Sequence, residues 1–108
     1  GWSMLLTGDL EDEGLKQVLA NPLPAVSVLM APHHGSDKSN IPELAKRTQP
    51  KLVISSQAEP TSERLSIARY EKAGARFLGT WPHGAITIRP GASPAVETYR
   101  TKQALAPF

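Results

Sequence analysis

The sequence contains no cysteine, which excludes a disulfide framework and any metal site built on thiolates. It has no apolar run near the roughly 20 residues that a transmembrane helix needs, and no signal-peptide pattern at its start. Twelve basic and ten acidic residues leave a net charge of +2, too small to indicate nucleic-acid binding by itself. We therefore expect one globular domain that makes no membrane contact of its own.

What the sequence does contain is an alternation of apolar runs and helical patterns. Buried strands are expected at residues 2–7, 26–30, 52–54 and 76–78, with helices between them. Later, residues 85–88 alternate as an antiparallel strand does, and a last edge strand is expected within 96–101. This order predicts an α/β fold with a mixed β-sheet and flanking helices. Residues 103–108 are expected to be a frayed tail.

Two of the predicted strands end in residues that can ligate a metal ion. Asp9 follows the first strand, and His33 and His34 follow the second. Because the carboxyl ends of parallel strands meet at one edge of a sheet, we expect Asp9 and the histidine pair to converge there. Successive side chains of an extended segment point to opposite faces, so only one of the two histidines is expected to face a shared site.

Several of these features also have an ordinary structural interpretation. An aspartate between a strand and a helix is typical of a helix N-cap, which is the alternative for Asp9. The pattern from Asn40 to Glu43 resembles a capping box and predicts a helix start at that point. His83 lies in a turn and is interpreted as a surface residue. Trp81 is interpreted as packing rather than as a base-stacking platform.

The segments Leu-Leu-Thr-Gly-Asp at residues 5–9 and Ala-Pro-His-His-Gly-Ser at 31–36 resemble a known family. They are similar to the C-terminal half of the metallo-β-lactamase-like domain in ComEC-type competence proteins, the DNA-uptake channels of bacteria. The resemblance continues through residues 50–55, 72–75 and 83–88. It implies that residues 1–102 are a partial metallo-β-lactamase-like domain, half of an αββα sandwich. It also implies a parent protein in the bacterial inner membrane, of which this segment is a soluble part.

The resemblance also implies roles for single residues. Asp9 matches the family's metal-bridging aspartate and His34 its last histidine ligand. His33 would lie beside the metals, where it could contact a scissile phosphate or shuttle a proton. The implied cofactor of the complete domain is zinc or manganese, and paired cations of this kind activate water for phosphodiester cleavage. DNA is the implied substrate of the parent protein.

The ligand set in this chain is incomplete. The family's His-x-His-x-Asp-His cluster belongs before Asp9, and it does not occur here. Since a catalytic zinc normally keeps three protein ligands, we expect the isolated chain to be inactive and to hold no metal tightly. The missing N-terminal half of the domain is then an expected partner. The alternative is a non-catalytic structural or nucleic-acid-contact module that has lost its metal site.

A half-domain also leaves one sheet face without its usual cover. Apolar residues expected on that face are Val26, Val28, Met30, Leu52 and Ile54. Two packed sheets normally bury their inner faces against each other, and large apolar patches are uncommon on soluble monomers. We therefore expect either self-association through this face or a tail, residues 96–108, folded across it.

Overall fold

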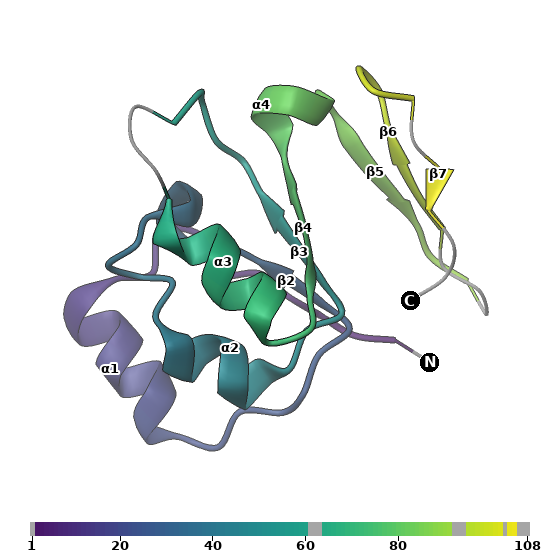
Figure 1. The fold of residues 1–108 in the computed structure, drawn as a ribbon. Helices are drawn as coiled ribbons and strands as arrows, with labels where there is room; N and C mark the ends of the chain where they lie inside the picture. Colours follow the sequence, from purple (N-terminus) through teal and green to yellow (C-terminus); the bar gives the residue numbers. More distant parts are fainter. Residues whose placement is uncertain (1, 61–63, 92–94, 103, 106–108) are drawn as a thin grey trace.

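The computed structural model describes residues 2–60, 64–91, 95–102 and 104–105, which form two β-sheets with helices on one side (Figure 1). The first sheet has four parallel strands in the order β1-β2-β3-β4. They are β1 Met4–Leu5, β2 Val28–Met30, β3 Leu52–Ser55 and β4 Arg76–Gly79. The helices that follow the first three strands are α1 Asp12–Ala20, α2 Pro42–Thr48 and α3 Leu65–Lys72. The predicted α/β class is confirmed.

The later strands form a separate antiparallel sheet rather than one edge of a single mixed sheet. It consists of β5 Ile86–Arg89, β6 Ala95–Thr98 and β7 Ala104–Leu105, in that order. A short helix, α4 Thr80–His83, and Gly84 at φ +70° turn the chain away from the parallel sheet before β5 begins. Two residues of the predicted tail thus lie in β7, and residues 103 and 106–108 fall outside the described part.

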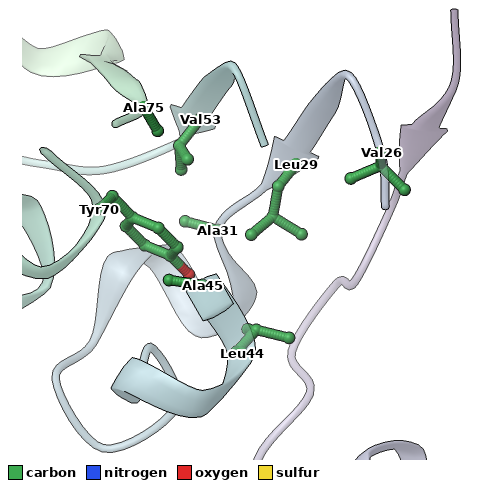
Figure 2. Close-up of a cluster of buried hydrophobic side chains, with 8 residues drawn as sticks. All are labelled: Val26, Leu29, Ala31, Leu44, Ala45, Val53, Tyr70 and Ala75. Atoms are coloured by element: carbon green, nitrogen blue, oxygen red, sulfur yellow. The ribbon is translucent and has the colours of Figure 1, made fainter. Parts of the chain in front are cut away.

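One apolar core lies between the parallel sheet and the helices (Figure 2). Leu29 of β2 and Val53 of β3 point to this face and are fully buried, as is Tyr70 of α3. Their neighbours Val28 and Leu52 point to the other face, because side chains alternate along a strand. The complete buried cluster is Val26, Leu29, Ala31, Leu44, Ala45, Val53, Tyr70 and Ala75.

A second core lies between the two sheets. Val96 of β6 is fully buried against Val28, Leu52 and Leu78 of the parallel sheet. Burying a side chain of this size is worth about 1.5–3 kcal/mol, so this layer contributes substantially to stability. Strand β6 therefore covers the centre of the sheet face that was expected to lack a cover in a half-domain. Val26, which was expected on this face, lies in the helical core instead.

Among the residues that the structure describes, we find no helix with the length and apolar character that crossing a membrane requires.

Candidate metal centre

Three loops meet at the carboxyl edge of the parallel sheet. The loop after β1 carries Asp9, the loop after β2 forms a 3-10 turn over Pro32–Gly35, and the loop after β3 carries Ser56. Neighbouring parallel strands end side by side, which brings residues far apart in the sequence into one place. A small pocket of about 80 Å³ lies between them. It is lined by Gly8, Asp9, Met30, Ala31, His34 and Ser56.

Two hydrogen bonds tie the first two of these loops together. The backbone N–H of His33 donates to the carbonyl oxygen of Gly8 at 2.9 Å. The hydroxyl of Thr7 donates to the carbonyl oxygen of Met30 at 2.6 Å. Each bond joins residues more than twenty positions apart, so the relative position of the loops is set by the sheet and by these contacts.

The side chains of Asp9 and His34 converge as expected. The Oδ1 atom of Asp9 lies 3.6 Å from Nε2 of His34, and both side chains are largely exposed. This distance exceeds the 2.7–3.2 Å typical of a direct N–H···O hydrogen bond. An exposed ion pair of this kind adds little to stability, so it does not by itself explain why the two residues meet.

The hydrogen bond at Nδ1 of His34 shows that Nε2 is the nitrogen available to bind a metal ion. Nδ1 lies 2.7 Å from the carbonyl oxygen of Ser56. A carbonyl can only accept, so Nδ1 carries the proton, and in the neutral ring the lone pair is on Nε2. That lone pair faces Asp9. A backbone carbonyl that fixes the tautomer in this way is typical of metal-ligating histidines.

The atoms present fit part of a zinc or manganese site. Carboxylate oxygen and imidazole nitrogen are both common ligands of such ions. With zinc–ligand bonds of about 2.0–2.2 Å, two ligands of a tetrahedral ion stand about 3.3–3.6 Å apart, close to the 3.6 Å between Asp9 and His34. Within the described residues, however, no group of three His, Cys, Asp or Glu side chains could hold a metal ion. The pair fits as two ligands of a larger set.

His33 faces a different acid from His34. Its Nδ1 lies 3.5 Å from Oε2 of Glu11 and 3.3 Å from the hydroxyl of Ser36. The centres of the two imidazole rings are 6.4 Å apart. Glu11 was not identified from the sequence as a candidate residue of the site. Glu11 lies near His33 because the loop after β1 is bonded to the histidine turn, as the bond from His33 to Gly8 shows.

The two histidines do not lie on an extended segment, contrary to our expectation. His33 (φ 49°, ψ 50°) and His34 (φ 53°, ψ 34°) are both in the left-handed region, and Gly35 follows at φ 78°. For a residue with a Cβ atom this conformation costs about 1–2 kcal/mol. Strain of this kind persists only where the surroundings impose it, and it clusters at functional sites.

The surroundings here are a buried hydrogen-bond network centred on Asn40. Its Nδ2 donates to the carbonyl oxygens of Pro32 at 2.9 Å and Ser36 at 2.7 Å. The hydroxyl of Ser66 donates to the carbonyl of Gly35 at 2.8 Å. The predicted capping box is therefore wrong: Ile41 is the N-cap of α2 and makes no side-chain cap bond. The Asn40 side chain supports the histidine turn instead.

A second anchor lies just beyond the turn. The backbone N–H of Ser66 in α3 donates to Oδ1 of Asp37 at 2.9 Å, and Arg69 donates to the Asp37 carbonyl at 2.8 Å. Burial acts to raise the pKa of Asp37. Backbone hydrogen bonds from Ser66 and Leu65, with the charges of Arg69 and Arg64, outweigh that effect and hold this pKa below its ordinary value. Asp37 is therefore held as a carboxylate that fastens the turn to α3.

His83 lies apart from this centre. It ends α4, and its Nδ1 lies 2.8 Å from the hydroxyl of Thr101 in an exposed position. Its interpretation as a surface residue is consistent with this placement.

Two curated proteins share sequence similarity with the chain. ComE operon protein 3 of Bacillus subtilis (strain 168) is 45% identical over 97 residues, an alignment covering 82% of this chain and 12% of the relative. Uncharacterized protein YcaI of Escherichia coli (strain K12) is 30% identical over 92 residues, covering 80% of this chain and 12% of that protein. The chain thus spans about an eighth of the length of these relatives. No protein-family model and no solved structure matches it.

Proposed function

We propose that the chain is part of a metallo-β-lactamase-like hydrolase domain in a ComEC-related DNA-uptake protein of the bacterial inner membrane. The parent would cleave phosphodiester bonds of DNA during uptake. The similarity to ComE operon protein 3 supports a competence-related parent. The metallo-β-lactamase-like assignment is supported by the motifs at residues 5–9 and 31–36. The observation that carries the proposal is the approach of Asp9 to the lone-pair nitrogen of His34.

In this proposal Asp9, His34 and His33 have different roles. Asp9 and His34 would hold zinc or manganese, together with ligands from the N-terminal half of the domain. The bound metal would activate water and stabilise charge on the phosphate. His33 would donate a hydrogen bond or a proton to the phosphate through Nε2, since Nδ1 faces Glu11 and Ser36. Glu11, whose Oε2 lies 3.5 Å from Nδ1, would help to orient the ring for that role.

One observation favours the alternative, a non-catalytic module. Only two of the described side chains meet as candidate ligands, and no third acid or histidine joins them. A chain that had lost its metal site would keep the fold and the strained turn but gain nothing from the ion. The two proposals differ in whether Mn²⁺ binds selectively at Asp9 and His34.

Paramagnetic Mn²⁺ titrated into the ¹⁵N-labelled chain tests the metal site directly. We expect the amide signals of Gly8, Asp9, His34 and Gly35 to broaden first, at weak affinity. Asp9→Asn or His34→Ala should each remove this selectivity. His83→Ala is the matched control and should leave it intact, because His83 is held by Thr101. Broadening with no preference for these residues would favour the non-catalytic module.

Activity is tested separately in the longer ComEC-related protein. There, Asp9→Ala or His34→Ala should reduce metal-dependent DNA cleavage to background, whereas His83→Ala should not. The isolated chain should show no cleavage above background. If the isolated chain bound two metals stoichiometrically, or cleaved DNA in a way that Asp9→Ala abolished, the half-domain proposal would be wrong.

A further inference from the structure

Two large aromatic side chains are exposed near one end of the antiparallel sheet. Trp81 in α4 is 45% exposed and Tyr99, just after β6, is 73% exposed. Rings of this size normally bury most of their surface, and Tyr and Trp left in the open are typical of binding surfaces. The sequence suggested that Trp81 serves only for packing, but its exposure leaves much of the ring free.

The segments that carry these two rings are fastened to each other. The backbone N–H of Tyr99 donates to the carbonyl of Ala85 at 2.9 Å, and that of Arg100 donates to the carbonyl of His83 at 2.7 Å. The guanidinium of Arg100 also donates to the carbonyl of Trp81 at 2.5 Å. Three hydrogen bonds thus join the segments that carry the two rings, which reduces the ordering that a ligand must impose on them.

Positive charge accompanies the aromatic rings. The ammonium group of Lys102 lies 5.2 Å from the centre of the Tyr99 ring, and Arg100, the next residue in the chain, is exposed. The acid closest to this group in the antiparallel sheet, Glu97, is paired with Arg89 at 3.2 Å, so its charge is largely offset. A pocket of about 280 Å³ adjoins the Tyr99 ring. It is lined by Ala85, Thr87, Glu97, Thr98, Tyr99 and Lys102.

We call Trp81, Tyr99, Arg100 and Lys102 the aromatic–basic patch, because Lys102 contacts the Tyr99 ring and Arg100 bonds the backbone of Trp81. The loop after β3 links this patch to the candidate metal centre. Ser56 in that loop accepts a hydrogen bond from His34. The next residue, Gln57, donates its backbone N–H to the hydroxyl of Thr80 at 3.0 Å, and Thr80 begins α4. One short segment thus contacts both the ligand histidine and the helix that carries Trp81.

We infer that the aromatic–basic patch binds single-stranded DNA and leads it toward the Asp9–His34 edge. The choice of DNA rests on the proposed function, whereas the binding mode rests on the patch itself. Exposed rings stack on unpaired bases, and adjacent cations neutralise the phosphates between them. A duplex keeps its base faces stacked internally and offers the rings nothing comparable. The patch therefore selects for a single strand.

Fluorescence of Trp81 provides the test, because the chain has only two tryptophans. In a Trp2→Phe variant of the 108-residue chain, Trp81 is the sole reporter. With EDTA present, a short mixed-sequence single-stranded oligonucleotide should quench it saturably, and the matching duplex should bind more weakly. Anisotropy of a labelled oligonucleotide with the unmodified chain gives the same affinities without relying on the variant's folding.

Substitutions locate the site. Tyr99→Ala should weaken binding about tenfold, the loss expected for one stacked base. Lys102→Ala should weaken binding and reduce the salt slope by about one. Lys46→Ala is the matched control: Lys46 is an exposed cation that lines another hollow between α2 and α3. An effect of Lys46→Ala with none from Tyr99→Ala or Lys102→Ala would overturn the assignment, as would preference for the duplex.

The design separates this inference from the proposed hydrolase function. The binding assay contains EDTA and therefore measures the patch without metal, whereas the Mn²⁺ titration measures the metal site alone. Absence of oligonucleotide binding would overturn the patch as a DNA site while the Mn²⁺ titration still decided the metal site. Binding without any selective Mn²⁺ effect would keep the patch and favour the non-catalytic module.

Discussion

The hydroxyl of Tyr70 donates a hydrogen bond to the side-chain oxygen of Asn40 at 2.5 Å, and both side chains are fully buried. Burial raises the pKa of Tyr70 well above its ordinary value, so the hydroxyl keeps its proton and remains a donor. Asn40 in turn donates to the carbonyls of Pro32 and Ser36. The shape of the histidine turn thus depends on a residue of α3 that lies outside the turn.

Tyr70→Phe tests this dependence. The variant keeps the ring in the core but leaves the Asn40 oxygen buried without its donor, which should lower the free energy of unfolding by about 1–3 kcal/mol. Urea denaturation followed by circular dichroism measures the loss. Tyr99→Phe is the control, since its hydroxyl is on an exposed side chain and its removal should change stability by less than about 0.5 kcal/mol. Equal effects of the two substitutions would contradict the network.

Asp37 should make stability depend on pH in the acid range. Its folded pKa lies below the ordinary value of 3.8, so the unfolded chain takes up the proton first as the pH falls. The stabilisation is therefore complete well above pH 3.8 and is lost as the pH drops through this value and below it. Comparing urea midpoints of the unmodified chain and Asp37→Asn between neutral and acid pH measures the effect.

We expect the unmodified chain to be more stable than Asp37→Asn at neutral pH, and this difference in the free energy of unfolding should shrink steadily as the pH falls. Asp12→Asn gives a control for general charge effects, because Asp12 lies in the first turn of α1, away from α3. A constant difference between the unmodified chain and Asp37→Asn at all pH values would show that the carboxylate is not the anchor of α3.

Gly35 should tolerate no side chain. It has φ +78°, and a Cβ atom there would lie 2.8 Å from the hydroxyl of Ser55 and 3.0 Å from Oε1 of Gln57. Gly74 is a matched control, with φ +92° but nothing within 4 Å of its Cβ position. Gly74→Ala should cost only the left-handed penalty of about 1–2 kcal/mol. Gly35→Ala should cost about 1–3 kcal/mol more, because of crowding.

Urea denaturation of the two variants under identical conditions checks this difference. If Gly35→Ala were no worse than Gly74→Ala, the close approach of the histidine turn to β3 would be absent in solution. In that case the position of His34 over Ser56 would also be in doubt.

The sequence was sufficient to predict the parallel sheet and the meeting of Asp9 with His34. Both follow from local patterns: apolar runs mark the strands, and the residue after each strand lies at the shared edge. The roles of Asp9, His34 and His33 stay predictions, because the geometry brings atoms together without showing what they bind.

The role of Asn40 and the conformation of the histidine turn depend on contacts between distant residues. Local sequence patterns predicted both incorrectly. Asn40 precedes Ile41, Pro42 and Glu43 in a good capping sequence, but its side chain makes its bonds to Pro32, Ser36 and Tyr70. Tertiary hydrogen bonds outweighed a local preference worth about 1 kcal/mol. The left-handed turn at the two histidines was missed for the same reason, since even for histidine a positive φ is uncommon and the turn is imposed by contacts with Asn40 and Ser66.

The second sheet gives the last prediction. The sequence offered two ways to cover the apolar face that holds Val28 and Leu52, namely self-association or a tail, residues 96–108, folded across it, and local patterns could not decide between them. In the structure Val96 covers Val28, Leu52 and Leu78. Val96→Ala should lower the free energy of unfolding by about 2 kcal/mol, through lost burial and a residual cavity. Val18→Ala, at a half-buried position of α1, should cost much less.

Truncation after Pro94 is the stronger test, because it removes β6 and β7 together and exposes the centre of the parallel sheet. Static light scattering at several protein concentrations should show self-association of the truncated chain under conditions where the full chain remains monomeric. Exposed apolar surface is the physical cause, since soluble monomers rarely leave a contiguous patch of more than a few hundred Å². The opposite result would be a truncated chain that remains monomeric and has the same urea midpoint of unfolding as the full chain. That result would mean that Val96 contributes nothing to covering this face.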